Sequence, residues 1–294
     1  MNRAAFLALV DDLRPALHRY CARMMGSAVE GEDVVQDTLL KALEAFPKTA
    51  DIIDPEAWLF RVAHNTALDA LRRRIRLVPL PIEQDDVPDP YDATERHEIA
   101  ALGLRPFMKL SPSERSSVIL KDVIGYSLSE IAEVLGITLP AVKAALHRGR
   151  ARLSDLSEVA EPDALALSSE ERALLQRYAE RFNAHDFEAV RDMLAEDVRL
   201  DLVGLTKLRG RATVTARYLG NYDRATDWRF TAGSIDGVAA LVAHHPVDPE
   251  MAASFVVLLT WRDGLVSVIR DFYHARYVID GARVTPAGMR GRLA

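Results

Sequence analysis

Polar and basic side chains recur between residues 138 and 152 at spacings that place several of them on one side of a helix. Lysine and arginine in such a row contact the phosphates of DNA, which gives affinity and register. Groups near the start of the row reach base edges, and we expect Lys143 and His147 to do so. The predicted DNA contacts of this row are Thr138, Pro140, Lys143, Ala144, His147, Arg148, Arg150 and Arg152.

The residues around this row have the spacing of a helix-turn-helix. Ala132 is small where two helices would cross, and Gly136 four residues later suits a tight turn. Val142, six residues further on, would pack the second helix against the first, and Thr138 would cap it. The spacing therefore predicts a DNA-binding helix-turn-helix, and a helical hairpin with a solvated basic face is the alternative.

A second polar stripe lies earlier, in the segment WLFRVAHNTALDALRRR. Its polar residues recur every three or four positions, so they share one helix face. Arginines on that face would grip a phosphate backbone, and the asparagine would contact bases or sugars. The predicted contacts are Arg61, Asn65, Asp69, Arg72, Arg73 and Arg74.

Two carboxylates of the last third, Asp201 and Asp271, fall within strand-like segments, and His274 lies close to the second. A carboxyl group buried among apolar walls would have a raised pKa, which suits acid–base chemistry. Asp271 could equally form a surface ion pair with the adjacent Arg270.

The elements that would hold these residues are helical in the first half of the chain. Apolar spacing predicts helices throughout residues 3–77, with a loop at 47–54 and an N-cap at Asp54. Residues 78–97 are rich in proline and acid and predict an extended linker. Residues 100–156 are helical again, with capping boxes at Ser111–Glu114 and Ser127–Glu130.

From Ser168 onward two helical segments precede strand-like alternation. Arg262-Asp263-Gly264 has the composition of a three-residue hairpin loop. Helices followed by a meander of strands predict an α+β domain. The predicted strands are 198–203, 228–232, 255–261 and 265–278.

Bulk properties agree with two or three domains, because the chain has 294 residues. Its formal net charge is −6, but the acid is concentrated: residues 78–100 hold seven acidic and one basic residue, whereas residues 101–156 hold five and eight. The single cysteine, Cys21, excludes a disulfide framework and a cysteine-rich zinc site. No long apolar run or signal-peptide layout occurs, so we expect a cytoplasmic protein.

Taken in order, the segments of residues 1–156 resemble an extracytoplasmic-function (ECF) sigma factor of the sigma-70 family. The resemblance implies that EDVVQDTLLKAL docks on the β′ clamp helices of RNA polymerase core. It also implies that the helix 58–74 and the preceding loop 46–54 bind and help open the −10 element, and that the helix-turn-helix binds the −35 element. In that loop, Ile52 and Ile53 fit the core equally well. The implied polymerase contacts are Asp33, Gln36, Asp37 and Leu40.

Residues 169–280 resemble the SnoaL-like branch of the NTF2-like fold, a curved sheet wrapped by helices into a cone with a cavity. In related sigma factors such a domain modulates activity, which implies a small-molecule or protein effector here. The chain lacks the Trp-Leu-Pro-Glu-Pro linker and the Asp-Gly-Gly-Gly-Arg motif of one subgroup. The expected cavity residues are Asp201, Trp228, Asp271 and Tyr273.

The predicted fold class is two all-α sigma domains followed by an α+β domain. We expect an alternative sigma factor with no catalytic residue, cofactor, metal ion or membrane partner. A homodimeric helix-turn-helix repressor, or a SnoaL-type cyclase or isomerase fused to DNA-binding domains, would explain part of the pattern. The predicted divisions are 1–77 (polymerase and −10 binding), 78–100 (acidic linker), 101–157 (−35 binding), 158–168 (linker), 169–285 (regulatory domain) and 286–294 (tail).

Overall fold

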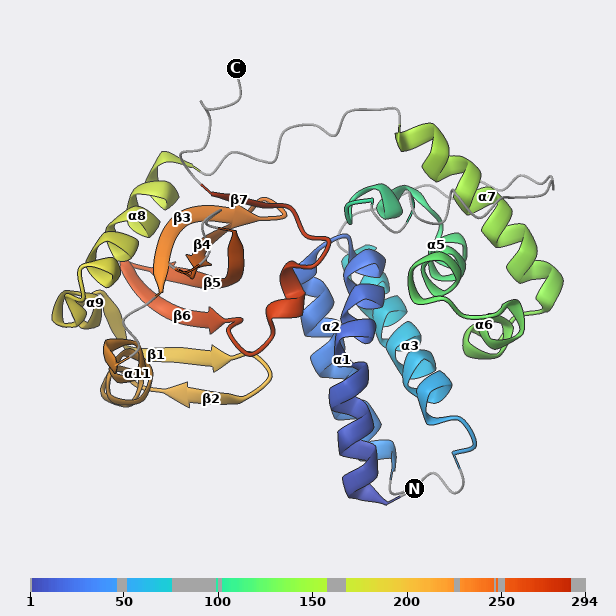
Figure 1. Cartoon of the computed structure of the whole chain (residues 1–294), viewed down its shortest axis with the longest axis horizontal. Coiled ribbons are helices and arrows are strands. Elements are labelled where there is room, and N and C mark those ends of the chain that lie inside the picture. The colour runs from blue at the N-terminus through green and yellow to red at the C-terminus, as the bar shows by residue number, and fades with distance from the viewer. Residues whose placement is uncertain are drawn as a thin grey trace. The chain divides into compact units, whose positions relative to one another are not determined.

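A computed structural model (Figure 1) describes residues 2–46, 52–75, 99, 102–157, 168–224, 228–245, 247 and 252–286. The chain forms two compact units, Met1–Glu161 (unit 1) and Pro162–Ala294 (unit 2). Apart from residues 99, 168 and 286, the predicted acidic linker 78–100, linker 158–168 and tail 286–294 lie outside the described residues.

Unit 1 begins with three helices, α1 (Arg3–Met25), α2 (Ala28–Ala45) and α3 (Pro55–Ile75). Gly26 ends α1 in the left-handed conformation at φ 72°, and Ser27 then caps α2, so the two helices turn sharply. The predicted cap of α3 is confirmed, since the Ala57 amide donates to Asp54 Oδ1 at 3.0 Å.

The second half of unit 1 consists of η2 (Pro106–Lys109), α5 (Pro112–Val118), the π-helical turn η3 (Ile119–Ile124), α6 (Leu128–Leu135) and α7 (Leu139–Ser157). Both predicted capping boxes are present: Ser111 with Glu114 begins α5, and Ser127 with Glu130 begins α6.

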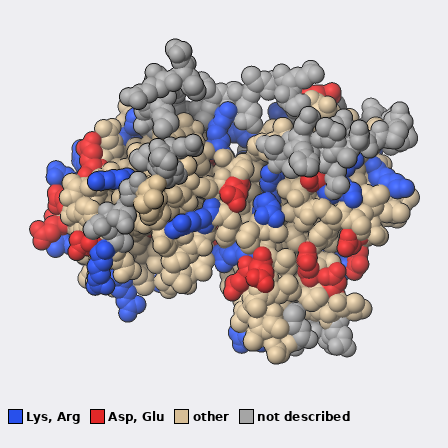
Figure 2. Space-filling model, in the orientation of Figure 1, with Lys and Arg blue, Asp and Glu red and all other residues tan. Residues whose placement is uncertain are grey.

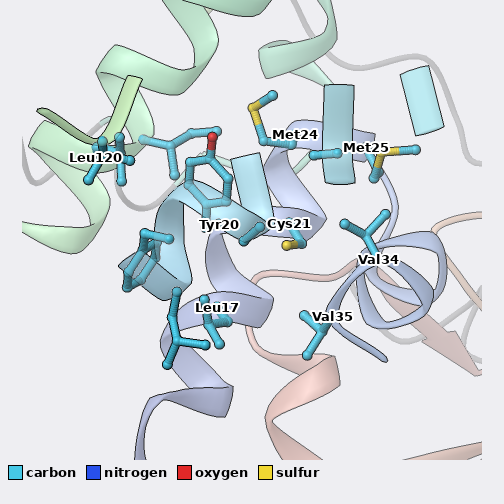
Figure 3. Close-up of a cluster of buried hydrophobic side chains, with 14 of the residues drawn as sticks. Leu17, Tyr20, Cys21, Met24, Met25, Val34, Val35 and Leu120 are labelled. Atoms are coloured by element: carbon cyan, nitrogen blue, oxygen red, sulfur yellow. The ribbon is translucent and has the colours of Figure 1, made fainter. Parts of the chain in front are cut away.

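One apolar core joins the two halves of unit 1. Buried side chains of α1 and α3 belong to the same cluster as those of α5, η3, α6 and α7. Figure 3 draws part of this cluster, where Tyr20 and Met24 of α1 lie with Leu120 of η3. The two predicted helical modules therefore pack together in one compact unit.

Gly149 lies in the middle of α7 at its crossing with α5. A Cβ atom there would come within 2.7 Å of Val118 Cγ2 and 3.3 Å of Glu114 Cβ. Only glycine allows the two helices to approach this closely, although glycine costs a helix interior about 1 kcal/mol relative to alanine.

Unit 2 combines helices with a seven-stranded sheet of order β2-β1-β6-β5-β4-β3-β7. Strands β1 and β6 are parallel and the other neighbours are antiparallel. The predicted α+β class is confirmed. The helical elements are α8 (Ser169–Asn183), α9 (Phe187–Asp192), α10 (Arg211–Val214), the π-helical η4 (Thr215–Leu219), α11 (Gly220–Arg224) and η5 (Arg276–Ile279). The strands are β1 (Leu194–Leu202), β2 (Thr206–Arg209), β3 (Arg229–Ile235), β4 (Val238–His244), β5 (Ala253–Arg262), β6 (Leu265–Asp271) and β7 (Val284–Pro286).

The strand predictions need three corrections, and the first is that β2, β4 and β7 were not predicted. Arg262 pairs with Leu265, so the β5–β6 hairpin has a two-residue loop, Asp263-Gly264, with both φ angles positive. The last predicted strand, 265–278, ends at Asp271, because the Asp271 side chain accepts the Tyr273 amide at 2.7 Å and turns the chain.

Candidate nucleic-acid interface

Helices α6 and α7 form the predicted helix-turn-helix. Gly136 takes the turn at φ 67°, and Val142 is fully buried against α6. The Ala141 amide donates to Thr138 Oγ1 at 3.4 Å, which caps α7. Thr138, Pro140 and Lys143 are exposed, whereas Ala144 and His147 are half-buried. Of the two expected base contacts, Lys143 is the more accessible.

The three predicted phosphate contacts of α7 differ in how far they are accessible. Arg150 makes two hydrogen bonds to Asp122 of η3, at 2.5 and 2.9 Å, and its side chain is 13% exposed. Arg148 and Arg152 both pair with Glu114 of α5, at 3.1 and 2.9 Å, and their side chains are 30% and 41% exposed. These pairs hold α7 against α5 and η3, and Arg150 is the arginine most withdrawn from solvent.

The predicted stripe on α3 is present as one exposed face that carries Arg61, Asn65, Asp69, Arg72 and Arg73. Arg72 pairs with Asp69 at 3.4 Å, and Arg73 with Asp37 of α2 at 3.9 Å. Surface ion pairs of this kind contribute little to stability, so the phosphates of DNA can replace the carboxylates as partners of these arginines. Arg74 lies apart, bonded to the Met25 carbonyl and paired with Glu30 at 3.2 Å.

Helix α2 carries the predicted polymerase contacts on one exposed edge. Asp33, Asp37 and Leu40 are exposed and Gln36 is half-buried. Leu40 is 60% exposed, which is unusual for a leucine on a helix that otherwise buries its apolar side chains. The neighbouring Glu32 is fully buried in an ion pair with Arg14, so it stabilises the fold and is not available to a partner.

A groove of about 600 Å³ joins the two helices. It unites residues predicted for two different partners: Asp37 and Leu40 for polymerase, and Asp69, Arg72 and Arg73 for DNA. Lys41 and Glu44 also line it and were missed, although they continue the Asp37 edge at helical spacing. The lining is balanced in charge, and Figure 2 likewise shows basic and acidic side chains interspersed on the visible face of each unit.

In unit 2 the structure separates the two candidate carboxylates. In the β1–β6 register Leu202 is the partner of Asp271, whereas Asp201 is the partner of Arg270 on the other face of the sheet. Asp201 pairs there with Lys207 at 3.5 Å and Arg270 at 4.0 Å. The expectation that Asp201 and Asp271 share a cavity is therefore wrong.

Asp271 is 1% exposed and accepts three hydrogen bonds. Tyr218 and Tyr222 donate their hydroxyls to Oδ2 at 2.7 and 2.8 Å, and the Tyr273 amide donates to Oδ1 at 2.7 Å. Burial raises the pKa of Asp271, and these hydrogen bonds oppose that shift. Sequence reasoning missed both tyrosines, although their spacing of four residues indicated one helix face.

Two other expected cavity residues lie together. The rings of Trp228 and Tyr273 are 5.8 Å apart, and both contact Phe255. The Arg276 guanidinium lies 4.7 Å from the Tyr273 ring centre and 5.2 Å from that of Trp228. His274, the third acid–base candidate, is exposed.

Over the described parts of the chain, no three His, Cys, Asp or Glu side chains are arranged to hold a metal ion. None of the helices in those parts combines the length and apolar character needed to cross a bilayer.

Known protein families match this chain in the same order as the three domains predicted from its sequence. Family models match three segments: Sigma-70 region 2 at residues 9–77, Sigma-70 region 4 at residues 107–153 and the SnoaL-like domain at residues 175–269.

Relatives cover different shares of the chain. The ECF RNA polymerase sigma factor SigG of Mycobacterium tuberculosis is 30% identical over 67% of this chain, which spans 60% of the length of SigG. The RNA polymerase sigma-E factor of Streptomyces avermitilis is 35% identical over 57% of this chain and 93% of its own. The crystal structure of M. tuberculosis ECF sigma factor SigJ aligns with 90% of this chain and 95% of its own, at 21% identity and a TM-score of 0.35. The family models and the Streptomyces relative show that the chain belongs to the ECF sigma factors of the sigma-70 family and carries a SnoaL-like domain after its helix-turn-helix.

Proposed function

We propose that the chain is an alternative sigma factor that binds RNA polymerase core and directs recognition of the −10 and −35 promoter elements. The observation that carries the proposal is the groove in which the exposed edge of α2 meets the polar stripe of α3. The proposed polymerase contact and the proposed DNA contact are adjacent in this groove. A subunit that positions promoter DNA on polymerase needs such an arrangement.

The edge of α2 is the polymerase contact in this proposal. Asp33, Asp37 and Leu40 would lie against the β′ clamp helices. An exposed leucine between carboxylates gives an apolar anchor with a polar rim, which is the usual composition of a protein interface.

The stripe of α3 and the loop before it form the −10 contact. Ile53 of that loop is 99% exposed, so it is not a core residue and is available to an extruded base. Extrusion of a base costs a few kcal/mol, which contacts with the loop and with Asn65 would offset.

The start of α7 forms the −35 contact, with Lys143 as the principal base reader. Thr138 supports this surface indirectly, since its hydroxyl caps the helix. Arg148 and Arg152 would contact phosphates, and Arg150 would act by holding α7 in place.

Unit 2 is the regulatory part in this proposal, and it acts without catalysis. The carboxylate of Asp271 is engaged by two tyrosine hydroxyls and one amide, so its oxygens stabilise the fold rather than face a substrate. An effector that binds unit 2 would change the activity of the sigma domains.

The test is co-purification with core polymerase followed by run-off transcription. The double variant Asp33→Ala with Gln36→Ala should weaken core binding and leave −35 preference unchanged. The matched control is Asp11→Ala with Asp12→Ala, two exposed positions on α1. Equal core affinity of the α2 variant and wild type would remove the docking assignment.

Two results would favour other functions. Tight binding to duplex DNA in a gel shift without core would indicate a repressor. Turnover of a polyketide-like substrate that is lost in Asp271→Asn would indicate an enzyme.

A further inference from the structure

We infer that Glu114 of α5 is a positioning residue for promoter binding: its buried carboxylate holds Arg148 and Arg152 of α7 in the orientation in which they contact DNA phosphates. The inference rests on the proposed function and deepens it, because it names the group that orients the −35 phosphate contacts. Glu114 itself is withdrawn from DNA, since its side chain is only 4% exposed.

The two oxygens of Glu114 are divided between the two arginines. Oε1 accepts a hydrogen bond from Nε of Arg148 at 3.1 Å, and Oε2 accepts one from Nη1 of Arg152 at 2.9 Å. Oε2 also accepts the Ser111 amide at 3.1 Å, which completes the capping box of α5. The carboxylate is thus fixed at the start of α5, and through it two long side chains of another helix are fixed as well.

Arg148 and Arg152 lie on the same side of α7 as part of the predicted groove surface. They follow Pro140 and Ala144 at intervals of four residues, so the four side chains succeed one another along one side of the helix. Side chains further along a helix that leaves the groove meet the phosphate backbone. The two arginine side chains are 30% and 41% exposed, so they remain accessible to phosphates while Glu114 binds them.

An arginine that is already oriented binds phosphate at a lower entropic cost. A long side chain loses rotamer freedom when it is fixed, and Glu114 fixes both guanidinium groups before DNA is bound. The close crossing at Gly149 makes this possible, because a Cβ atom there would come within 3.3 Å of Glu114 Cβ. The two helices are therefore near enough for direct ion pairs across the crossing.

Charge and position give opposite expectations for the loss of the Glu114 carboxylate. A carboxylate near DNA repels phosphates, so its removal should strengthen binding if charge alone matters. Loss of the fixed position of two arginines should instead weaken binding. The loss should be equal for every −35 sequence, because phosphate contacts carry no sequence information.

The test replaces Glu114 by glutamine and measures promoter binding over a range of salt concentrations, with holoenzyme formed from the full chain and RNA polymerase core. Glutamine keeps the size of the side chain and can still cap α5, but it offers no charge to the arginines. Each phosphate contact contributes about 0.9 to the slope of log affinity against log salt concentration, so we expect the slope to decrease by about 1 to 2. Affinity should fall by the same factor on promoters with different −35 elements.

The matched control is Asp122→Asn. Asp122 is another buried carboxylate that binds an arginine of α7, and its partner Arg150 is 13% exposed and holds the helix in place in the proposed function. Both variants should lower the free energy of unfolding in urea, but Asp122→Asn should leave the salt slope unchanged. A purely structural role of Glu114 would leave the slope unchanged in both variants.

Two further variants separate position from charge and from folding. Glu114→Asp keeps the charge but retracts the carboxylate by one methylene group, so it should also decrease the slope, and it tests the position of the carboxylate even if the glutamine variant unfolds. In a chain that carries Arg148→Gln and Arg152→Gln, the additional change Glu114→Gln should leave the slope unchanged, because its effect passes through the arginines.

Tighter promoter binding by Glu114→Gln, or an unchanged salt slope in both Glu114 variants, would overturn the inference and leave the proposed function intact. If the wild-type holoenzyme does not bind promoter DNA, the proposed function fails and the inference fails with it.

Discussion

Single residues of α7 divide between the proposed recognition of the −35 element and support of the fold. Lys143 is exposed at the start of the helix, whereas Arg150 is turned inward to Asp122. The sequence presents both as members of one basic row. Only the position of the acidic partners on α5 and η3 separates them, and those partners are about 30 residues away in the chain.

Replacement of Lys143 by alanine should weaken −35 binding by about 1–3 kcal/mol if the ammonium reads a base. Because the side chain is exposed, the free energy of unfolding should change by less than about 0.5 kcal/mol. The measurement is holoenzyme binding to promoters that differ only in the −35 element. A uniform loss across all sequences would mean that Lys143 contacts phosphate instead.

His64 makes unit 1 sensitive to acid. Burial lowers the pKa of His64 to about 4, and the positive charge of Arg72 adds to the shift. Nδ1 of His64 lies 2.9 Å from the Tyr20 hydroxyl and 3.2 Å from Ser116 Oγ, so the ring nitrogen has neutral partners only. Between about pH 6.5 and pH 4 the unfolded chain therefore binds more protons than the folded one.

The contribution of His64 to the free energy of unfolding should thus be constant above about pH 6.5 and fall by about 3 kcal/mol as the pH drops to 4. Urea unfolding at a series of pH values measures this slope. His64→Gln should flatten it, and the same slope in both chains would contradict the assignment.

At the scale of elements, the sequence predicted the helices better than the strands. The capping boxes at Ser111 and Ser127 lie on single short segments, so they can be recognised without tertiary information. Strand β4 was missed, although Asp236-Gly237 before it forms a hairpin turn like Asp263-Gly264. Most of its residues are buried, so it shows no alternation of apolar and polar side chains.

The candidate site of unit 2 depends on strand register and tertiary packing, which could not be predicted from the sequence. Asp201 and Asp271 look alike in the chain, and only the register of β1 against β6 places them on opposite faces. Tyr218 and Tyr222 come from a helical segment about 50 residues before Asp271, so their contact depends on tertiary packing.

The Asp271 cluster should act as a structural tie between α11 and β6. Tyr222→Phe removes one hydroxyl donor from a buried carboxyl group and should lower the free energy of unfolding of unit 2 by about 2 kcal/mol. Thermal unfolding of the full chain measures this loss. The exposed Thr260→Ala is the control, and equal stability of the two variants would contradict the tie.

At the scale of the molecule, each unit has its own apolar core. Removal of unit 2 after Glu161 should therefore leave unit 1 folded and, if unit 2 regulates as proposed, change promoter-directed transcription. A protease site inserted between residues 161 and 162 allows the same preparation to be assayed before and after cleavage. Unchanged run-off transcription after cleavage would count against a regulatory role.

Gly149 separates the proposed −35 contact of α7 from the part of the helix that packs on α5. The first two turns, up to about residue 147, meet solvent on one side, while Gly149 and the arginines around it clamp the helix to α5. The proposed recognition surface and the anchoring contacts thus occupy consecutive stretches of one helix. A cassette covering residues 138–147 can be swapped for that of another sigma factor if its inward-facing apolar residues and the glycine after it are kept.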